Sequence, residues 1–259
     1  MKKIFSLMTL TIIGAIAIAT IQLWSSTQQP NGANGKVAAE TPPPPAPVEL
    51  KIFTPHSFDF TNERTSLTKN QLDQTHKIYL ELVKKRAEME LLLATVNTSD
   101  ATNTIYSPFR SLKIAEPFTR NGVIFYEIYF ENLKQGTTMG PKTKAFLIKD
   151  FGSIENFKKN LMACASSARG WAITFYTIDN KRLRNYVLDG NDQNVPILAI
   201  PIIVLNMHEH AYALDYGTDR ARHLNNIWDS IDWNVIEKRI IDWVLSIAPE
   251  RQEKLVGKK

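Results

Sequence analysis

The spacing of apolar residues predicts two helices joined as a hairpin in the first half of the folded region. Residues 66–93 are rich in helix formers, and apolar and aromatic side chains recur on one side at helical spacing. A polar break at residues 97–103 and Pro108 follows, and the apolar segment 123–133 then has the register of a second helix. Two helices joined in this way form an antiparallel hairpin.

Beyond Gly136 the pattern alternates between helix and strand. Two segments have helical periodicity and three are rich in β-branched and aromatic residues. The helical segments are 142–151 and 154–167, and the strand-like segments are 171–178, 182–187 and 197–205. Pro196 and Pro201 bracket a short apolar run in the manner of a strand at a protected or edge position, because proline cannot donate to a ladder. The polar sequence from Glu209 to Ile247 is predicted to be helical.

The N-terminal end has the pattern of an export signal. Lys2 and Lys3 precede an uncharged apolar run over residues 4–24, which contains small residues suited to a signal peptidase. The run is also long enough to span a bilayer at roughly 20 residues per crossing. Residues 1–26 are therefore predicted to be a signal peptide or an N-terminal membrane anchor. In both cases the paired lysines stay in the cytoplasm, so the rest lies in the periplasm, soluble or anchored to the inner membrane through residues 4–24.

Composition divides the remaining chain. Residues 27–48 are polar, small and proline-rich, which predicts a disordered linker. The folded region divides into a helical hairpin domain, 49–135, and an α/β domain, 136–259.

The single cysteine, Cys164, excludes an intrachain disulfide. The net charge of +5 comes from basic and acidic residues that are mostly interleaved, which indicates solubility and no nucleic-acid partner.

Several motifs in the second half of the chain match one known family in order and distance. Residues 209–239 read EHAYALDYGTDRARHLNNIWDSIDWNVIEKR and resemble the C-terminal signature of iron/manganese superoxide dismutases almost without a gap. Upstream, NLKQGTT at 132–138, DFGSIENFK at 150–158 and the pair Gly170 and Trp171 also match. The resemblance implies an α+β fold, with an N-terminal helical hairpin packed on a C-terminal domain whose three-stranded antiparallel sheet is surrounded by helices. It also implies a homodimer and one metal ion between the domains.

The resemblance implies that most metal ligands have been replaced. In the family, one histidine from each hairpin helix, with an aspartate and a histidine at the end of the last strand, hold the metal. The corresponding positions here are Thr75, Tyr126, Asn206 and His210, so His210 is the sole retained ligand. Because iron and manganese need several convergent imidazole and carboxylate ligands, no cofactor is expected. The neutral side chains of Tyr126 and Asn206 would hydrogen-bond each other and fill the emptied site.

A rearranged site is the alternative. His76 is one residue from the first ligand position, and His208 replaces a tryptophan that lines the family's pocket. Together with His210 they are candidate ligands, with zinc the typical occupant of a histidine cluster. His56 and His223 lie in polar sequence and are predicted at the surface.

Two further family roles are assigned by the resemblance. Gln193 falls near the family's outer-sphere glutamine and is the candidate for that role, although a gap would place Asn191 or Asn194 there instead. Glu209 and His210 are the candidate dimer contact, because in the family the glutamate of one subunit bonds the ligand histidine of the other.

Two functions fit this sequence. The first is an exported superoxide dismutase-fold protein that has lost the metal site and acts as a non-catalytic structural or binding component of the bacterial cell envelope, with protein partners in a larger secretion or transport assembly. The alternative is an envelope superoxide dismutase, converting superoxide to oxygen and hydrogen peroxide at an atypical site that holds iron, manganese or zinc. Loss of ligands beside preserved core motifs favours the first function.

Overall fold

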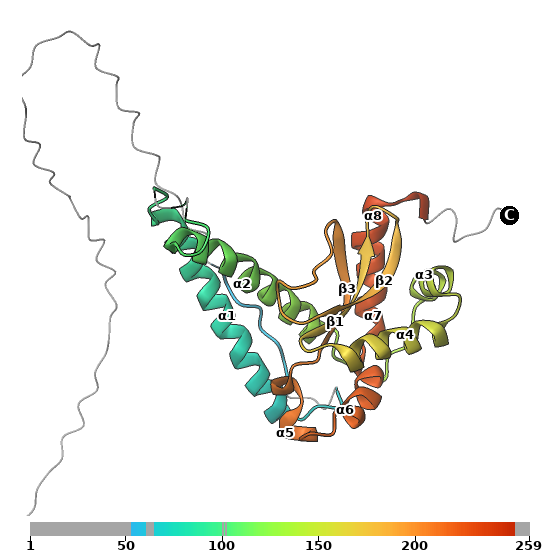
Figure 1. The fold of residues 1–259 in the computed structure, drawn as a ribbon. Helices are drawn as coiled ribbons and strands as arrows, with labels where there is room; N and C mark the ends of the chain where they lie inside the picture. Colours follow the sequence, from blue (N-terminus) through green and yellow to red (C-terminus); the bar gives the residue numbers. More distant parts are fainter. Residues whose placement is uncertain (1–52, 61–64, 100, 102, 252–259) are drawn as a thin grey trace, which may run out of the picture. The chain divides into compact units, whose positions relative to one another are not determined.

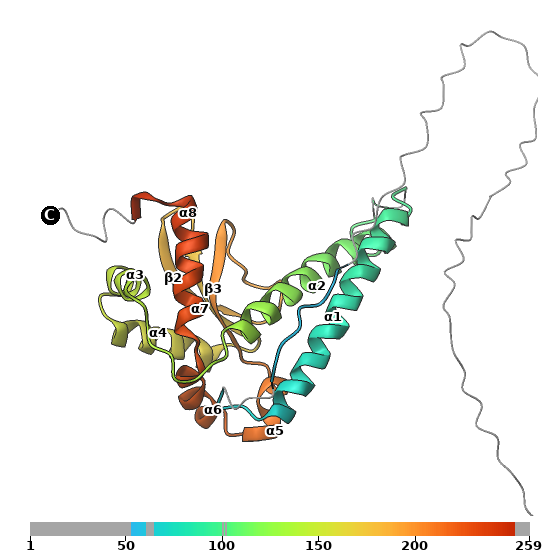
Figure 2. The ribbon, with the colours of Figure 1, turned by 180° about the vertical axis from the view of Figure 1, so that it is seen from behind.

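Two long helices form the predicted hairpin (Figures 1 and 2). In the computed structural model, which describes residues 53–60, 65–99, 101 and 103–251, α1 spans Lys69–Thr95 and α2 spans Pro108–Glu131. The side chains of Thr68 and Ser107 cap these helices by accepting backbone N–H groups of their first turns. The second helix begins well before the predicted segment because Pro108 occupies its first turn, where a missing N–H costs no hydrogen bond.

An extended segment, residues 53–60, lies between α1 and α2 in both views and is called the strap (Figures 1 and 2). The Arg86 guanidinium lies 3.8 Å from the centroid of the Phe53 ring. At the other end of the strap, the rings of Phe60 and His76 have centroids 5.5 Å apart. Because Arg86 follows His76 along α1, the strap runs antiparallel to that helix.

The C-terminal part is a three-stranded antiparallel sheet with helices around it. The first elements are α3 (Pro141–Phe151), α4 (Ile154–Ser167), β1 (Trp171–Thr177), β2 (Arg182–Leu188) and β3 (Ala199–Asn206). The strand order is β2-β1-β3, and both pairings are antiparallel. The central strand β1 is buried along its whole length, because alternate side chains pack toward the hairpin on one face and toward the C-terminal helices on the other. The predicted α+β fold is confirmed.

The segment after β3 is broken into short helices, whereas the sequence predicted a more continuous helical stretch. They are η1 (Glu209–Ala211), α5 (Ala213–Tyr216), α6 (Arg220–Ile227), η2 (Trp228–Ser230), α7 (Trp233–Arg239), the π-helical η3 (Ile240–Val244) and α8 (Leu245–Ile247). Gly217 ends α5 with φ +57°, a conformation that favours glycine. Asp219 and Asp232 then cap α6 and α7.

Pro201 lies at an irregularity of edge strand β3, as its sequence position predicted. Thr174 pairs with Ile203, whereas the next β1 residue, Phe175, pairs with Pro201, so Ile202 is an extra residue. Its carbonyl accepts a hydrogen bond from Arg239 Nη1 at 2.8 Å. The bulge thus accommodates Pro201, which has no N–H. The buried guanidinium of Arg239 satisfies the Ile202 carbonyl that the bulge displaces from the ladder.

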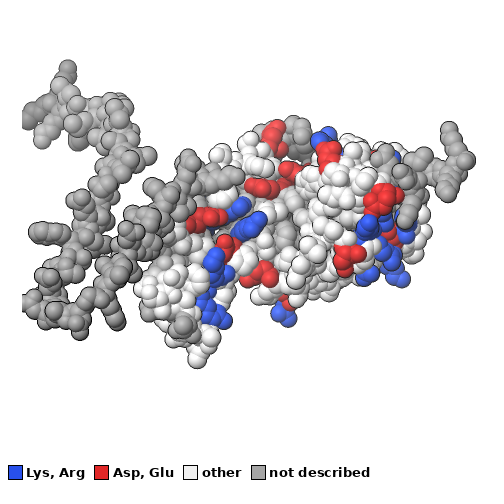
Figure 3. All heavy atoms as spheres, turned by 90° about the horizontal axis from the view of Figure 1, so that it is seen from above, with Lys and Arg blue, Asp and Glu red and all other residues white. Residues whose placement is uncertain are grey.

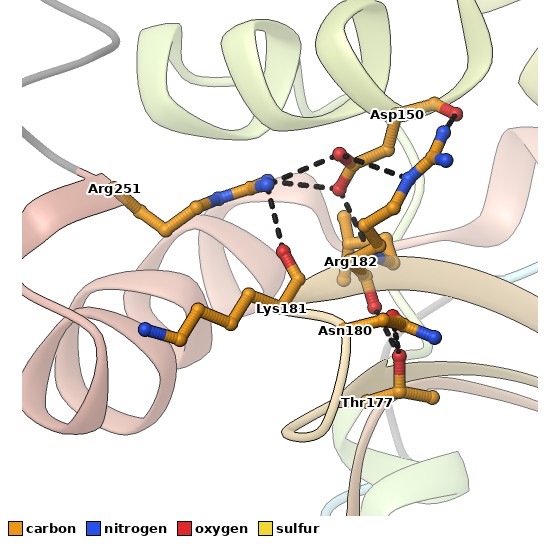
Figure 4. Close-up of polar contacts among 7 residues, drawn as sticks. Asp150, Thr177, Asn180, Lys181, Arg182 and Arg251 are labelled. Carbon is orange, nitrogen blue, oxygen red and sulfur yellow. Dashed lines mark hydrogen bonds and ion pairs between the residues drawn. The ribbon is translucent and has the colours of Figure 1, made fainter.

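A buried ion pair ties the end of the described chain to the sheet (Figure 4). Arg251 Nη2 donates to Asp150 Oδ2 at 2.8 Å, and Arg251 Nη1 donates to the carbonyl of Lys181 at 2.8 Å. The same carboxylate accepts the backbone N–H of Leu183 at 2.8 Å. The side chains of Asp150 and Arg251 are only 2% and 6% exposed, so Arg251 is the buried partner of this carboxylate. Arg182 Nε lies 3.8 Å from Asp150 Oδ1, but the Arg182 side chain is 48% exposed.

The predicted signal or anchor and the linker lie outside the described residues. Within the parts of the chain that the structure describes, no helix is both long and apolar enough to cross a bilayer.

Candidate functional site

The four family ligand positions converge between the hairpin and the end of β3. Thr75 projects from α1, Tyr126 from α2, Asn206 ends β3 and His210 lies in η1. Thr75 Oγ1 donates to the carbonyl of Gln71 at 2.9 Å and lies 3.3 Å from the carbonyl oxygen of His210. The structure therefore brings together the residues that the family register assigned to the site.

Tyr126 forms a short hydrogen bond with the one retained family ligand. Its hydroxyl oxygen lies 2.7 Å from Nε2 of His210. Burial raises the pKa of Tyr126 above its usual range, and the neighbouring Asn206 amide offsets part of that rise. The phenol therefore stays protonated at neutral pH and remains a neutral partner of the imidazole.

The Asn206 carboxamide is directed toward His208. Its Oδ1 accepts the backbone N–H of His208 at 3.1 Å and lies 2.9 Å from Nδ1 of the same residue. Its Nδ2 is buried without a hydrogen-bond partner among the described residues. The sequence predicted a hydrogen bond between Tyr126 and Asn206, whereas the short hydrogen bond of Tyr126 is made to His210.

The rings of His208 and His210 stack on each other. Their centroids are 4.9 Å apart and their planes differ by 18°. Burial lowers the pKa of both imidazoles, that of His208 to about 4 with a further contribution from His210. Because imidazole lone pairs lie in the ring plane, two nearly parallel rings do not direct them at one point. The pair is therefore neutral at physiological pH but not arranged to share a metal ion.

His76 lies in a different environment. A step of one residue turns the side chain by about 100° around a helix, and Thr75 already faces His210. The His76 ring packs against Phe58, Phe60 and Phe130 at centroid distances of 5.5 to 5.9 Å. Its Nε2 is buried, with no hydrogen-bond partner in the part of the chain that the structure describes. The structure does not bring His76 together with the other two candidate histidines.

Of the outer-sphere candidates, Asn191 is the buried one. Its Oδ1 accepts a hydrogen bond from Trp171 Nε1 at 2.9 Å, whereas Gln193 and Asn194 are exposed. Gly122 of α2 leaves room for this amide, because a Cβ there would lie 2.5 Å from Asn191 Nδ2. The sequence alone favoured Gln193. Periodicity does not fix where a gap falls in the turn before β3, so it could not select Asn191.

The donor set at this site does not fit iron or manganese. A threonine hydroxyl, a protonated phenol, a carboxamide and one imidazole supply no anionic ligand, and such sites depend on ligand number and charge. Within the described ranges, no three His, Cys, Asp or Glu side chains form a group that could hold a metal ion. Glu209 and part of His210 are exposed at the surface of the single chain, whereas the His210 ring contacts Tyr126, and their dimer contact stays a prediction.

His223 is buried, whereas the sequence predicted a surface position; His56 is exposed, as predicted. The His223 ring stacks on Tyr212, with centroids 4.7 Å apart and 13° between the planes. Burial lowers the pKa of His223 to about 4, and Arg220 adds to the lowering. The available signal was the spacing to Ile227, four residues later on the same buried side of α6.

Buried His223 predicts that the protein loses stability in acid. The unfolded chain takes up a proton near the ordinary histidine pKa of about 6.5, whereas the folded chain does so only near 4. The free energy of unfolding is therefore unaffected by His223 above about pH 6.5. It falls between pH 6.5 and pH 4, by up to about 3 kcal/mol for this residue. Urea unfolding at pH 7.5 and pH 5 should show a smaller loss for His223→Phe than for the parent. His56→Phe, at an exposed histidine, should keep the parental loss, and an unchanged loss in His223→Phe would contradict the assignment.

Comparison with known proteins extends the motif matches. The model for "Iron/manganese superoxide dismutases, C-terminal domain" matches residues 139–239. Superoxide dismutases [Fe] of Aquifex pyrophilus and Aquifex aeolicus are each 33% identical over 165 residues, which is 62% of this chain and 78% of each relative. Superoxide dismutase [Mn] 1 of Halobacterium salinarum is 38% identical over 85 residues, 33% of this chain and 42% of the relative. With the helical hairpin, the β2-β1-β3 sheet and these matches in place, this chain belongs to the iron/manganese superoxide dismutase family.

Proposed function

We propose that this protein is an exported, non-catalytic member of the family that acts as a structural or binding component of the bacterial cell envelope. One observation carries the proposal: Tyr126 stands at a family ligand position and forms a 2.7 Å hydrogen bond with His210, the retained ligand. Tyr126 replaces one metal donor, and its hydrogen bond occupies Nε2 of His210, which is the second. The same contact stabilises the fold.

The chemistry of the neighbouring residues supports the same proposal. Dismutation needs a metal that exchanges one electron in each direction, held by ligands that set its potential. Thr75 and Asn206 are poor replacements for an imidazole and a carboxylate. The buried Tyr126 hydroxyl is a poor replacement for an imidazole as well, because its raised pKa disfavours the phenolate.

The proposed location rests on the N-terminal sequence. The lysine pair and the apolar run over residues 4–24 are typical of export, with the folded region in the periplasm, released or held at the inner membrane. Its partners would be envelope proteins, within a secretion or transport assembly, and a second copy of the chain. The residues that carry the family signature would in that case be retained for the fold they specify.

Metal content and activity test the loss of catalysis. We expect the full chain, produced in turn with iron, manganese and zinc supplied, to be folded by circular dichroism, nearly metal-free by elemental analysis, and inactive toward superoxide. The matched control is an Aquifex superoxide dismutase [Fe] produced and assayed in parallel. Stoichiometric metal together with superoxide consumption would overturn the proposal and favour an envelope dismutase with an atypical site.

A further inference from the structure

The distal end of the hairpin exposes apolar side chains. Between Glu90 of α1 and Arg110 of α2 the sequence holds a single charged residue, Asp100. Ile105 is 91% exposed and Tyr106 is 73% exposed. The exposed large apolar residues at this end, called the hairpin tip, are Leu91, Leu92, Ile105, Tyr106, Ile114 and Phe118. An exposed apolar group of this kind marks an interaction surface more often than a chance arrangement.

A groove runs into the same end of the hairpin. It has a volume of about 550 Å³ and is lined by side chains of both helices and of the connection between them. The main apolar residues of its lining are Leu92, Val96, Tyr106, Pro108 and Leu112. The groove and the hairpin tip therefore form one apolar surface.

Basic side chains border this surface on both helices. Five basic side chains are exposed there, namely Lys84 and Lys85 on α1 and Arg110, Lys113 and Arg120 on α2. Fewer acidic side chains lie among them: Glu88 and Glu90 are exposed, and Glu116 pairs with Lys113 at 2.9 Å. In Figure 3 the uncharged end of the hairpin, at the left of the folded part, is followed by blue side chains with red ones beside them. Apolar and tyrosine side chains beside a basic border are the arrangement that favours the interface of a bilayer with anionic headgroups.

The N-terminal end of the strap lies on the half of α1 that is nearer the hairpin tip. Phe53 packs on Arg86, and nine residues (95 − 86) separate Arg86 from the end of α1 at Thr95, or about 14 Å along a helix. The 28 residues from 25 to 52 (52 − 25 + 1) can reach roughly 90 Å when extended. An anchor at residues 4–24 would therefore hold the hairpin tip within reach of its own membrane at high effective concentration.

We propose that the hairpin tip docks on the lipid bilayer that holds residues 4–24, with its apolar residues in the interfacial layer and the basic border at anionic headgroups. This inference rests on the uncleaved-anchor form of the proposed function. The tip is small, so tethering and apolar contact act together, as two weak membrane signals do in other proteins. Docking would fix the orientation of the sheet domain relative to the membrane.

Site-specific fluorescence in vesicles tests the docking. The full chain, in a Cys164→Ser background, would carry Ile105→Cys labelled with an environment-sensitive nitrobenzoxadiazole dye, in vesicles of phosphatidylethanolamine and phosphatidylglycerol. The matched control is Leu214→Cys, an exposed position at the opposite end of the hairpin, where the Leu214 backbone N–H bonds Gln71. We expect spin-labelled lipid to quench the dye at position 105 several-fold more than at 214. Tyr106→Asp should reduce the quenching at 105 without releasing the protein from the vesicles.

The outcomes separate the tip from the anchor. If the chain floats with the vesicles but both dyes are quenched equally, docking of the tip is wrong and the proposed function stands. If the dye at 105 is blue-shifted but not quenched by lipid, a protein covers the tip, which also overturns lipid docking. If the chain does not float at all, the anchor and this inference both fail, whereas the metal and activity measurements still decide the non-catalytic role.

Discussion

Restoring three family ligands should turn this chain into a metal-binding protein. The combined variant Thr75→His, Tyr126→His and Asn206→Asp would supply two imidazoles and a carboxylate beside His210. Because the hairpin and β3 already place these positions together, the new donors need no change of fold. We expect about one iron or manganese ion per chain after dialysis, against almost none in the parent, with superoxide consumption gained. Elemental analysis and a superoxide assay would measure both.

Two matched variants make this result specific. Adding His210→Ala to the combined variant should remove the metal, because only three protein ligands remain. Adding His76→Ala should leave the metal content unchanged, because His76 packs among aromatic rings away from the site. A combined variant that is folded by circular dichroism yet binds no metal would show that the register of the ligand positions is wrong.

Arg251→Met should strongly destabilise the fold. The substitution keeps an apolar side chain of comparable length but leaves the Asp150 carboxylate buried without its bidentate partner (Figure 4). Breaking a buried ion pair from one side costs about 3–5 kcal/mol. Urea unfolding should therefore show a markedly lower midpoint with an unchanged slope.

The chain offers its own control for this experiment. Lys181 pairs with Glu250 at the surface, with side chains 57% and 39% exposed, so Lys181→Met should cost less than about 1 kcal/mol. Adding Asp150→Asn to Arg251→Met should recover part of the loss, because a neutral amide is less costly to bury than a carboxylate that has lost its buried partner. Equal effects of Arg251→Met and Lys181→Met would contradict the role assigned to the buried pair.

The elements that sequence predicted well are those with a local signal at each end. Helix α4 has the predicted bounds because Gly152 and Ser153 precede it, the serine accepting the N–H of Asn156 as its cap. The start of α2 was missed because Pro108 reads as a break as readily as a helix start. The stretch after β3 was predicted as helical because each short helix has suitable composition. Its division into several pieces depends on Gly217 and on tertiary packing, which periodicity does not encode.

The candidate site was predictable where the family register could be counted residue by residue. Thr75, Tyr126, Asn206 and His210 meet as that register implied. The choice between Gln193 and Asn191 was not predictable in this way, because it depends on the path of a turn and on the space above Gly122. Burial of His223 was missed because polar neighbours in the sequence do not report which side of a short helix faces the core.

The strap has a mechanical consequence. Its rings contact α1 and α2 at successive points from Phe53 to Phe60, and it runs antiparallel to α1. A pull on the N-terminal side toward the distal end of the hairpin would act along the strap and load these contacts in shear, all at once. A pull across the hairpin would instead peel them off one by one, beginning at Phe53. The resistance of the fold to force would therefore depend on the direction from which its own tether pulls.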